Sequence, residues 1–294
     1  MKGLLERLAE GEVLISDGAM GTLLQASGLA PGDCPESWCV SHPDVVRKIS
    51  EAYIAAGADI VETNSFGGSS FKLSYYRLAH KVREFNRAAA SLARDAMGGR
   101  GYVAASVGPT GHIPEEENGD VPSAQLYQAF REQVLALAEG GADAICVETM
   151  TSLLEAVQAV RAARDNTALP VICTFTFESG PRGFYTMMGA TPAAAAREAA
   201  AAGADIVGAN CGNGIAGMIE ITRQMRAEMP RIPILIHANA GVPEWEDGRT
   251  LFRETPEYMA SRVKELIAAG ANVVGGCCGT TPSHIAAMAK AARA

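Results

Sequence analysis

The sequence has few basic residues, few histidines and no long apolar run. It contains 25 Lys and Arg against 33 Asp and Glu, with no basic cluster, so nothing in it points to nucleic-acid binding. No segment approaches the roughly 20 apolar residues of a membrane helix, and the charged residues 1–8 lack the apolar core of a signal peptide. These absences indicate a globular protein, for which we expect a cytoplasmic location.

The cysteines do not suggest a disulfide framework. Their number, seven, is odd, and a chain of 294 residues does not need disulfides to be stable. We therefore expect reduced thiols. Cys146 and Cys173 lie inside apolar runs and are interpreted as small core residues. Cys34 and Cys39 share a loop and could form a second metal or redox pair, although an incidental position is the simpler interpretation.

One short phrase occurs four times along the chain. It contains Gly-Ala followed by Asp or Asn and an apolar pair, at 56–61, 140–145, 202–207 and 269–274. Each copy follows a helical pattern and opens a short apolar run. The glycine suits the C-terminal cap of a helix, and the residues after it lead into a strand.

Each interval between copies is long enough for two strand–helix units. Four further apolar runs fill the remaining places, at 13–17, 102–107, 170–175 and 232–237. Eight strands that alternate with helices predict one α/β domain over residues 1–294, a (β/α)8 TIM barrel with its active site at the C-terminal ends of the strands. The irregular stretches are expected to be enlarged loops, at 31–43, 108–123 and 239–256.

Three cysteines stand at predicted strand ends. Cys211 follows one strand, and Cys277 and Cys278 follow another, with a single strand expected between the two. Adjacent residues in a strand point to opposite faces, so both members of the pair reach one ion only if the strand has ended, which the glycines around them allow. Three thiolates can hold Zn²⁺ and leave a fourth position open for a substrate thiol.

Two carboxyl groups are expected at the same mouth. Asp17 and Glu148 follow predicted strands and could hold a substrate ammonium, and the turn at Gly18 could approach a carboxylate because a helix is expected to begin near Ala19. Simpler roles exist for each: Asp17 could cap that helix, and Glu148 could form an ion pair at the rim.

Other polar residues at strand ends are more ambiguous. Asn64 and Asn210 are candidates for the substrate pocket, but either could simply satisfy backbone groups. His237 could be a ligand or a base, and a hydrogen-bonded histidine at the rim is the simpler interpretation. Thr281 and Pro282 have the pattern of a helix N-cap and first turn.

Together these residues resemble the homocysteine S-methyltransferase family. The resemblance runs from residues 17–22 (Asp-Gly-Ala-Met-Gly-Thr) to residues 275–282 (Gly-Gly-Cys-Cys-Gly-Thr-Thr-Pro), nearly the whole chain. Residues 62–66 and 239–241 are more similar to the homocysteine-binding module of cobalamin-dependent methionine synthase than to the betaine-dependent enzymes. In those enzymes an aromatic residue tends to occupy the position of Gly67.

The resemblance implies a role for each matched residue. It implies zinc on Cys211, Cys277 and Cys278, with the homocysteine sulfur as fourth ligand. Asp17 and Glu148 would hold the amino group, with Gly18 near the carboxylate, and Asn210 would lie beside the zinc. His112, His237 and residues 187–189 depart from the pattern of the family.

The activity implied is methyl transfer to homocysteine, giving methionine. The donor would be a methyl-corrinoid (methylcobalamin) carried on a separate protein, because no cobalamin-binding segment follows the barrel here, or S-methylmethionine. An alternative is a corrinoid-system methyltransferase with another methylated substrate or thiol acceptor. A lyase or hydrolase that acts through metal-bound water would use histidine or carboxylate ligands, and it is disfavoured because the sequence has only five histidines. A non-enzymatic scaffold is disfavoured because it would not need polar groups at nearly every strand end.

Overall fold

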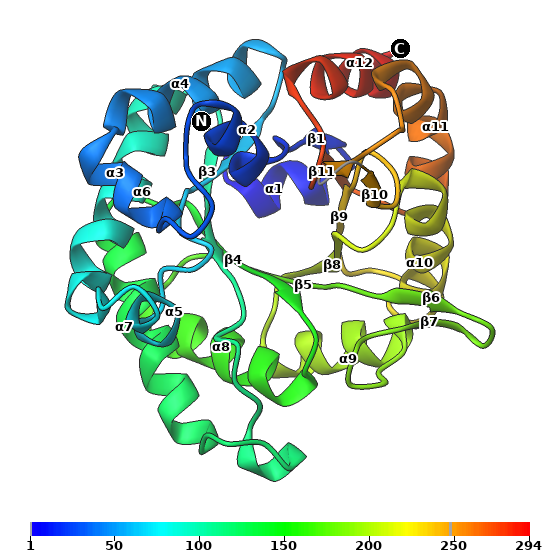
Figure 1. Ribbon diagram of the computed structural model, residues 1–294. Helices are drawn as coiled ribbons and strands as arrows, with labels where there is room; N and C mark the ends of the chain where they lie inside the picture. The colour runs from blue at the N-terminus through cyan, green and yellow to red at the C-terminus, as the bar shows by residue number, and fades with distance from the viewer. Residues whose placement is uncertain (1, 247–248) are drawn as a thin grey trace.

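The computed structural model describes residues 2–246 and 249–294, and its core is a ring of eight parallel strands surrounded by helices (Figure 1). The barrel strands are β1 (Leu14–Ile15), β2 (Ile60–Glu62), β3 (Tyr102–Val107), β4 (Ala144–Met150), β5 (Val171–Phe175), β8 (Ile206–Asn210), β9 (Ile234–Ala238) and β12 (Val273–Gly276). They pair in this order around the ring, and a bridge between Ser16 and Ile60 joins β1 to β2. The predicted (β/α)8 barrel is confirmed.

Eight helices form the outer layer of the barrel. They are α4 (Pro43–Ala55), α6 (Val82–Met97), α7 (Ser123–Glu139), α8 (Leu153–Asn166), α9 (Pro192–Ala202), α10 (Ile215–Glu228), α11 (Pro256–Ala268) and α12 (Pro282–Arg293). The strands are buried on both faces, which explains their continuous apolar runs. The predicted N-cap at Thr281 with Pro282 in the first turn is confirmed for α12.

The repeated phrase joins each helix to the next strand. Its glycine has a positive φ in all four copies (Gly57, Gly141, Gly203 and Gly270), a conformation in which a side chain would be strained. Its Asp or Asn accepts a hydrogen bond from the backbone N–H of the preceding strand. The four pairs are Asp59 with Ile15, Asp143 with Val103, Asp205 with Val171 and Asn272 with Ile234. Each copy therefore fixes two neighbouring strands in register.

Four shorter helices complete the α-helices of the described residues: α1 (Leu4–Ala9), α2 (Met20–Ala26), α3 (Trp38–Ser41) and α5 (Ser70–Ser74). The helix expected near Ala19 is confirmed as α2, with Ala19 as its N-cap. Among these residues, no helix has both the length and the apolar character needed to cross a membrane.

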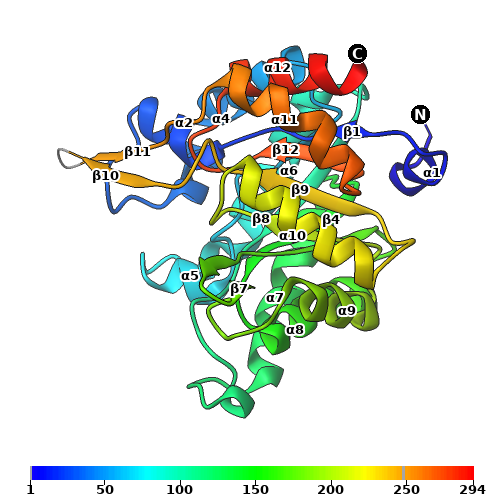
Figure 2. The same ribbon diagram turned by 90° about the vertical axis from the view of Figure 1, so that its right-hand side faces the viewer.

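The enlarged loops contain more structure than the sequence predicts. Residues 31–43 include a 3-10 turn (Pro35–Ser37) and α3, and a second 3-10 turn (Glu115–Glu117) lies within 108–123. Two hairpins follow barrel strands: β6 (Glu178–Gly180) with β7 (Gly183–Tyr185), and β10 (Glu244–Glu246) with β11 (Arg249–Leu251). The second projects from the barrel beside α2 (Figure 2). The enlarged loops expected at 31–43, 108–123 and 239–256 thus contain short elements of secondary structure, and the hairpin of β6 and β7 lies outside those stretches.

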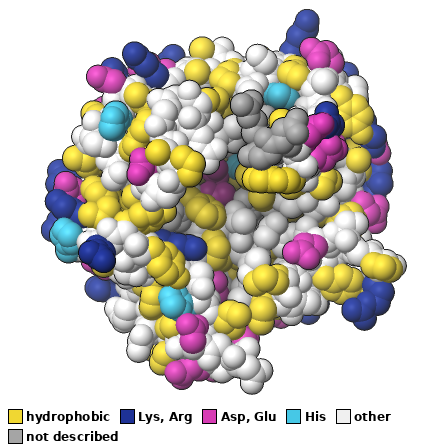
Figure 3. Space-filling model, viewed as in Figure 1, with side chains coloured by type: hydrophobic (Ala, Val, Ile, Leu, Met, Phe, Trp, Pro, Cys, Tyr) yellow, Lys and Arg dark blue, Asp and Glu magenta, His cyan; other side chains and the backbone are white. Residues whose placement is uncertain are grey.

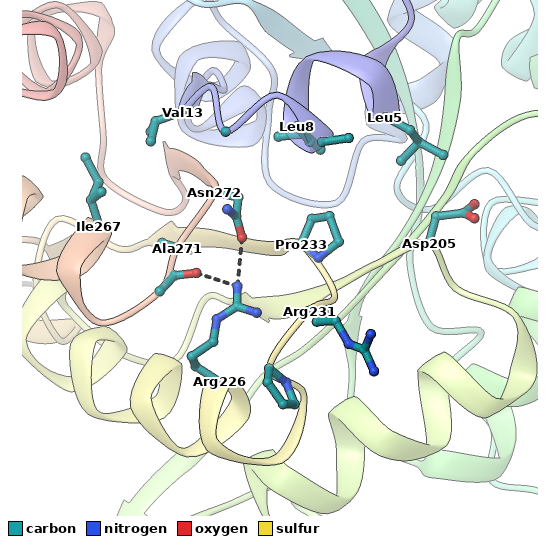
Figure 4. Close-up of a pocket in the computed structure, with 14 residues that line it drawn as sticks. Leu5, Leu8, Val13, Asp205, Arg226, Arg231, Pro233, Ile267, Ala271 and Asn272 are labelled. Atoms are coloured by element: carbon teal, nitrogen blue, oxygen red, sulfur yellow. Dashed lines mark hydrogen bonds between the residues drawn. The ribbon is translucent and has the colours of Figure 1, made fainter.

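A cavity of about 670 Å³ lies at the opposite end of the barrel, where α1 covers the N-terminal ends of the strands (Figure 4). Arg226 lies on its wall, and both terminal nitrogens of its guanidinium are hydrogen-bonded within the protein. Its guanidinium donates to the carbonyls of Met229, Ile232 and Gly270 and to the side chain of Asn272, each at 2.8 Å. This end of a (β/α)8 barrel contributes to stability, and Arg226 serves that role here.

Candidate metal and substrate site

The three cysteines predicted to bind metal come together at the mouth of the barrel. Cys211 follows β8, Cys277 and Cys278 follow β12, and β9 lies between these strands. The sulfurs of Cys211 and Cys278 are 3.8 Å apart, and all three sulfurs lie within 4.8 Å of one another. Two sulfurs bound at about 2.3 Å to a tetrahedral zinc are also about 3.8 Å apart. The three side chains therefore fit a single soft metal ion.

The backbone bends sharply at both places. Strand β12 ends at Gly276, so the cysteines that follow are free to turn to one side, as the sequence requires. A Cβ atom on Gly276 would lie 2.4 Å from the hydroxyl of Thr280, so only glycine fits there. Cys211 itself adopts a φ of 61°. A left-handed conformation costs a non-glycine residue roughly 1–2 kcal/mol, which the surrounding fold must offset.

Hydrogen bonds among the thiols divide their protons unequally. The pKa of Cys211 is lowered because its thiolate accepts hydrogen bonds from Cys277 and Cys278, while the pKa values of Cys277 and Cys278 are raised by the same contacts. These contacts favour the thiolate form of Cys211 over that of Cys277 or Cys278. Cysteine binds a metal ion as thiolate, so a divalent soft cation would displace the thiol protons of the cluster.

Asn210 connects the cysteines to Glu148. Its amide oxygen accepts hydrogen bonds from the backbone N–H of Thr149 (2.8 Å) and the hydroxyl of Thr174 (2.7 Å). Its amide nitrogen donates to Glu148 Oε2 at 3.1 Å and lies 3.9 Å from the sulfur of Cys277. The prediction that Asn210 satisfies a backbone group is thus confirmed, and its amide nitrogen also faces the cysteine cluster.

Glu148 is buried and turned into the barrel by a local irregularity. The register between β4 and β5 shifts between Val147 and Met150, and Thr149 has a φ of 59°. The two carboxylate oxygens accept hydrogen bonds from the hydroxyl of Ser106 and from Asn210. No Lys or Arg of the described residues pairs with it, so an ion pair at the rim is not its role. Burial raises the pKa of Glu148 to about 7.

Asp17 lies beneath the site and does not cap a helix. Ala19 is the N-cap of α2, and no side chain caps it. The carboxylate of Asp17 instead accepts hydrogen bonds from the backbone N–H of Glu62 (2.8 Å) and the hydroxyl of Ser16 (3.3 Å). Only 2% of Asp17 is exposed, and this burial raises its pKa to about 7.

A cavity of about 290 Å³ opens beside the cysteines, and Figure 3 shows the hollow at the barrel mouth. Its wall contains the three cysteines, Glu148 and Thr149, the turn at residues 18–22, residues 35–36, and residues 62–66. No Lys, Arg or His of the described part of the chain lines it. Gly18 is held close to Thr280, where a Cβ would lie 2.5 Å from the hydroxyl. The pocket is thus acidic and thiol-rich, and suits a small cationic thiol.

The remaining sequence candidates contribute less to this site. Asn64 reaches the cavity wall, but its amide donates to the carbonyl of Pro35 at 2.8 Å, which confirms the backbone role. His112 is bonded to Asp120 (2.7 Å). The thiols of Cys34 and Cys39 contact Glu36 (3.3 Å) and the carbonyl of Asn64 (3.4 Å). Among the described residues, only Cys211, Cys277 and Cys278 form a group that could hold a metal ion.

The sequence analysis misassigned His237 and overlooked Glu62. His237 is 2% exposed and its Nε2 has no hydrogen-bond partner in the described structure, so it is not a hydrogen-bonded rim residue. Burial lowers its pKa to about 4. Its Nδ1 lies 3.8 Å from Glu62 Oε1. Glu62 ends β2 and lines the cavity. In the sequence, Glu62 directly precedes the polar residues at the end of its predicted strand, and this position was the one sign that it could belong to the site.

The closed (β/α)8 barrel and the three convergent cysteines at its mouth define the class of the chain: a TIM barrel with a thiol cluster that could hold a metal ion. The model of the family described as homocysteine S-methyltransferase matches residues 14–292, and the chain belongs to this family. The predictions of the family and of a methyltransferase are thereby confirmed.

Curated relatives include the methionine synthases of Mycobacterium tuberculosis and Mycobacterium leprae, which are 35% and 34% identical to this chain over 98% of its length. The chain spans about a quarter of the length of those relatives (25%).

Among solved structures, the metallated form of the homocysteine methyltransferase MmuM from Escherichia coli matches 98% of this chain and 99% of that one, with a TM-score of 0.81 and 23% identity. The apo form of the same protein gives a TM-score of 0.74 at 22% identity. At this level of identity the likeness shows the fold alone.

Proposed function

We propose that the chain transfers a methyl group to homocysteine to form methionine, with zinc held by Cys211, Cys277 and Cys278. The observation that carries this proposal is the convergence of three sulfurs within 4.8 Å beside an acidic cavity. Zinc, when bound, supplies an open coordination position and lowers the pKa of a thiol that occupies it. A cavity of about 290 Å³ has the size for a small amino acid.

The chain's own residues would bind and orient the substrate. Glu148 and Asp17 would hold the ammonium group, with Asn210 fixing Glu148 through the 3.1 Å hydrogen bond. Gly18 lines the cavity, where its backbone would lie near the carboxylate. Held at both ends, the substrate would place its sulfur toward the cysteines. Orientation of this kind accounts for a large part of the rate of a bimolecular reaction.

The transfer itself is a nucleophilic displacement. The substrate sulfur, having lost its proton, attacks the methyl carbon of the donor. A sulfur–carbon bond forms while the bond between that carbon and the donor atom breaks, and the donor keeps the electron pair. Exclusion of water by the closed base of the cavity favours this step, because a desolvated thiolate is the stronger nucleophile.

An exposed apolar rim favours a large donor, and we propose a methyl-corrinoid carried by a separate protein. Four large hydrophobic side chains in segments that follow barrel strands are exposed: 41% of Phe66, 65% of Met187, 62% of Val242 and, on β10, 76% of Trp245. Hydrophobic side chains are visible around the hollow in Figure 3. Exposed apolar side chains that gather at a site often mark a contact with another protein or a large ligand. S-methylmethionine, a small donor, would not require it.

The test is a donor screen with purified, zinc-loaded protein and homocysteine. Free methylcobalamin, a methyl-corrinoid protein and S-methylmethionine are supplied in turn, and methionine is measured by mass spectrometry. We expect methionine with a corrinoid donor and its loss in Cys211→Ala. The variant Trp245→Ala should impair only the protein-bound donor. Methyl transfer to other thiols but not to homocysteine would identify a different acceptor, and absence of transfer from every donor would contradict the proposal.

A further inference from the structure

Glu62 is the one carboxylate of the site with an oxygen that lacks a nitrogen or hydroxyl donor. Its Oε1 is buried and accepts no hydrogen bond from a nitrogen or oxygen of the described residues. By contrast, both oxygens of Glu148 and both oxygens of Asp17 accept hydrogen bonds. A buried acceptor without a donor costs roughly 1–3 kcal/mol, so an unpaired oxygen in a native site calls for an explanation.

No neighbouring side-chain nitrogen of the described residues supplies the missing donor. The nearest candidate is His237, whose Nδ1 is 3.8 Å from Glu62 Oε1, beyond hydrogen-bond distance. His237 is itself 98% buried, and its Nε2 has no partner among the described residues. The cavity wall offers no lysine or arginine in the part of the chain that the structure describes. Oε1 is therefore enclosed between His237 and the buried thiol of Cys146, which acts as a hydrogen-bond donor to this carboxyl, and Oε2 is the oxygen left to accept a hydrogen bond from a ligand.

Glu62 is also placed to meet a ligand. Its side chain is 15% exposed and lines the same cavity as Glu148 and the cysteines. Its backbone N–H donates to the carboxylate of Asp17 at 2.8 Å, so the two acidic residues are direct neighbours. Charges of the same sign in such a confined volume repel one another, and a cation that entered among them would relieve this repulsion.

We propose that Glu62 accepts a hydrogen bond from the ammonium group of the substrate, as a third carboxylate in addition to Asp17 and Glu148. This inference depends on the proposed function, since it assigns a further contact to the same amino-acid site. It explains why a carboxylate lines a cavity that has no basic residue among its described lining. It also makes the amine a requirement for tight binding, so that thiols without an amine are rejected.

The test compares two ligands that differ only in the amine. Binding of homocysteine and of 4-sulfanylbutanoate, the same thiol acid without the amine, is measured by isothermal titration calorimetry on zinc-loaded protein. Glu62→Gln should weaken homocysteine binding roughly tenfold or more and leave 4-sulfanylbutanoate unchanged. Zinc content, measured separately by a chromogenic chelator, should stay stoichiometric. Glu155→Gln is the matched control, because Glu155 is also a largely buried glutamate (2% exposed) but lies outside the cavity.

The outcomes separate this inference from the proposed function. Equal losses for both ligands, or no loss for either, would show that Glu62 does not contact the amine. If the wild-type protein binds neither thiol, the proposed function fails as well. Should Gln at position 62 prevent folding, Glu62→Asp keeps the charge but withdraws the carboxylate, and the same selective loss of homocysteine is expected.

Discussion

Arg293 of the last helix is hydrogen-bonded to Asp59, which precedes the second strand: its Nη2 is 3.0 Å from Asp59 Oδ2 and 2.9 Å from the carbonyl of Gly57. The same contact occurs in every copy of the repeated phrase. The other pairs are Arg94 with Gly141 and Asp143, Arg164 with Gly203 and Asp205, and Arg226 with Gly270 and Asn272. These contacts link a helix to the start of a strand at four places around the barrel, and the contact of Arg293 links the last helix to the residues just before the second strand.

These four contacts should differ in their contribution to stability. Arg226 is half-buried and donates hydrogen bonds to four acceptors. Because Arg226→Ala leaves these acceptors without their donor, it should lower the free energy of unfolding by about 2–3 kcal/mol. The side chain of Arg293 is 53% exposed, so Arg293→Ala should cost less than about 1 kcal/mol. Urea denaturation of both variants measures the difference. Equal losses would show that burial does not decide the strength of the contact.

The fold was predictable because the barrel repeats a local pattern. In the four copies of the repeated phrase, the glycine after a helix and the Asp or Asn before a strand mark the element boundaries, and parallel strands follow from their alternation with helices. The hairpins of β6 with β7 and β10 with β11 were missed because β6 and β10 are exposed, β7 is only partly buried, and none of them shows an apolar alternation. A hairpin that is held mainly by hydrogen bonds between its own two strands produces no recognisable hydrophobic pattern in the sequence.

The cysteine cluster was also predictable, because all three residues follow strands whose order in the barrel is known. Glu62 and His237 could not be assigned, since their roles depend on contacts across the barrel. Irregularities such as the shift in register between β4 and β5 at Val147–Met150 decide whether a side chain at a strand end points inward or outward. No pattern in the sequence predicted that shift. The predicted roles of Asp17, Gly18 and Glu148 in binding remain proposals for experiment.

Replacement of Cys211 should remove zinc and leave the barrel folded. Cys211→Ala deletes one of the three sulfurs, and two thiolates bind zinc much more weakly than three. The hydrophobic core does not involve this side chain, so the circular dichroism spectrum should be unchanged. Cys173→Ala is the control, because Cys173 is fully buried within β5, away from the cluster. Stoichiometric zinc in Cys211→Ala, measured by atomic absorption, would show that the ligand set is wrong.

Asn210→Asp should weaken homocysteine binding more than it weakens the fold. The substitution places a carboxylate oxygen against Glu148 Oε2, where the amide donor now lies at 3.1 Å. Repulsion would displace Glu148, and we expect roughly a tenfold loss of homocysteine affinity. Asn86→Asp is the matched control, since Asn86 is fully buried, is hydrogen-bonded to the carbonyls of Gly68 and Val82, and does not line the cavity.

That control should lower the melting temperature without changing the affinity for homocysteine. Calorimetric titration and thermal melting, applied to both variants, separate the two effects. If Asn210→Asp binds homocysteine as tightly as the wild type, Asn210 does not position Glu148.

The buried carboxyl of Asp17 should make stability depend on pH. Desolvation raises the pKa of Asp17 from 3.8 to about 7 in the folded state. Below the unfolded pKa the carboxyl is neutral in both states and its contribution to stability is fully present. As pH rises toward 7, the unfolded state releases its proton first, so this contribution is lost progressively and stays lost above pH 7.

Asp17→Asn cannot ionise and should lack this loss. The free energy of unfolding of the variant, relative to that of the wild type, should therefore increase between pH 5 and pH 8 by on the order of 1–3 kcal/mol. Urea denaturation of chelator-treated protein at pH 5, 6, 7 and 8 measures it, and removal of metal keeps zinc binding from contributing its own pH dependence. A difference that stays constant with pH would mean that Asp17 is already ionised in the folded protein, with the hydrogen bonds from Glu62 and Ser16 outweighing the cost of burial.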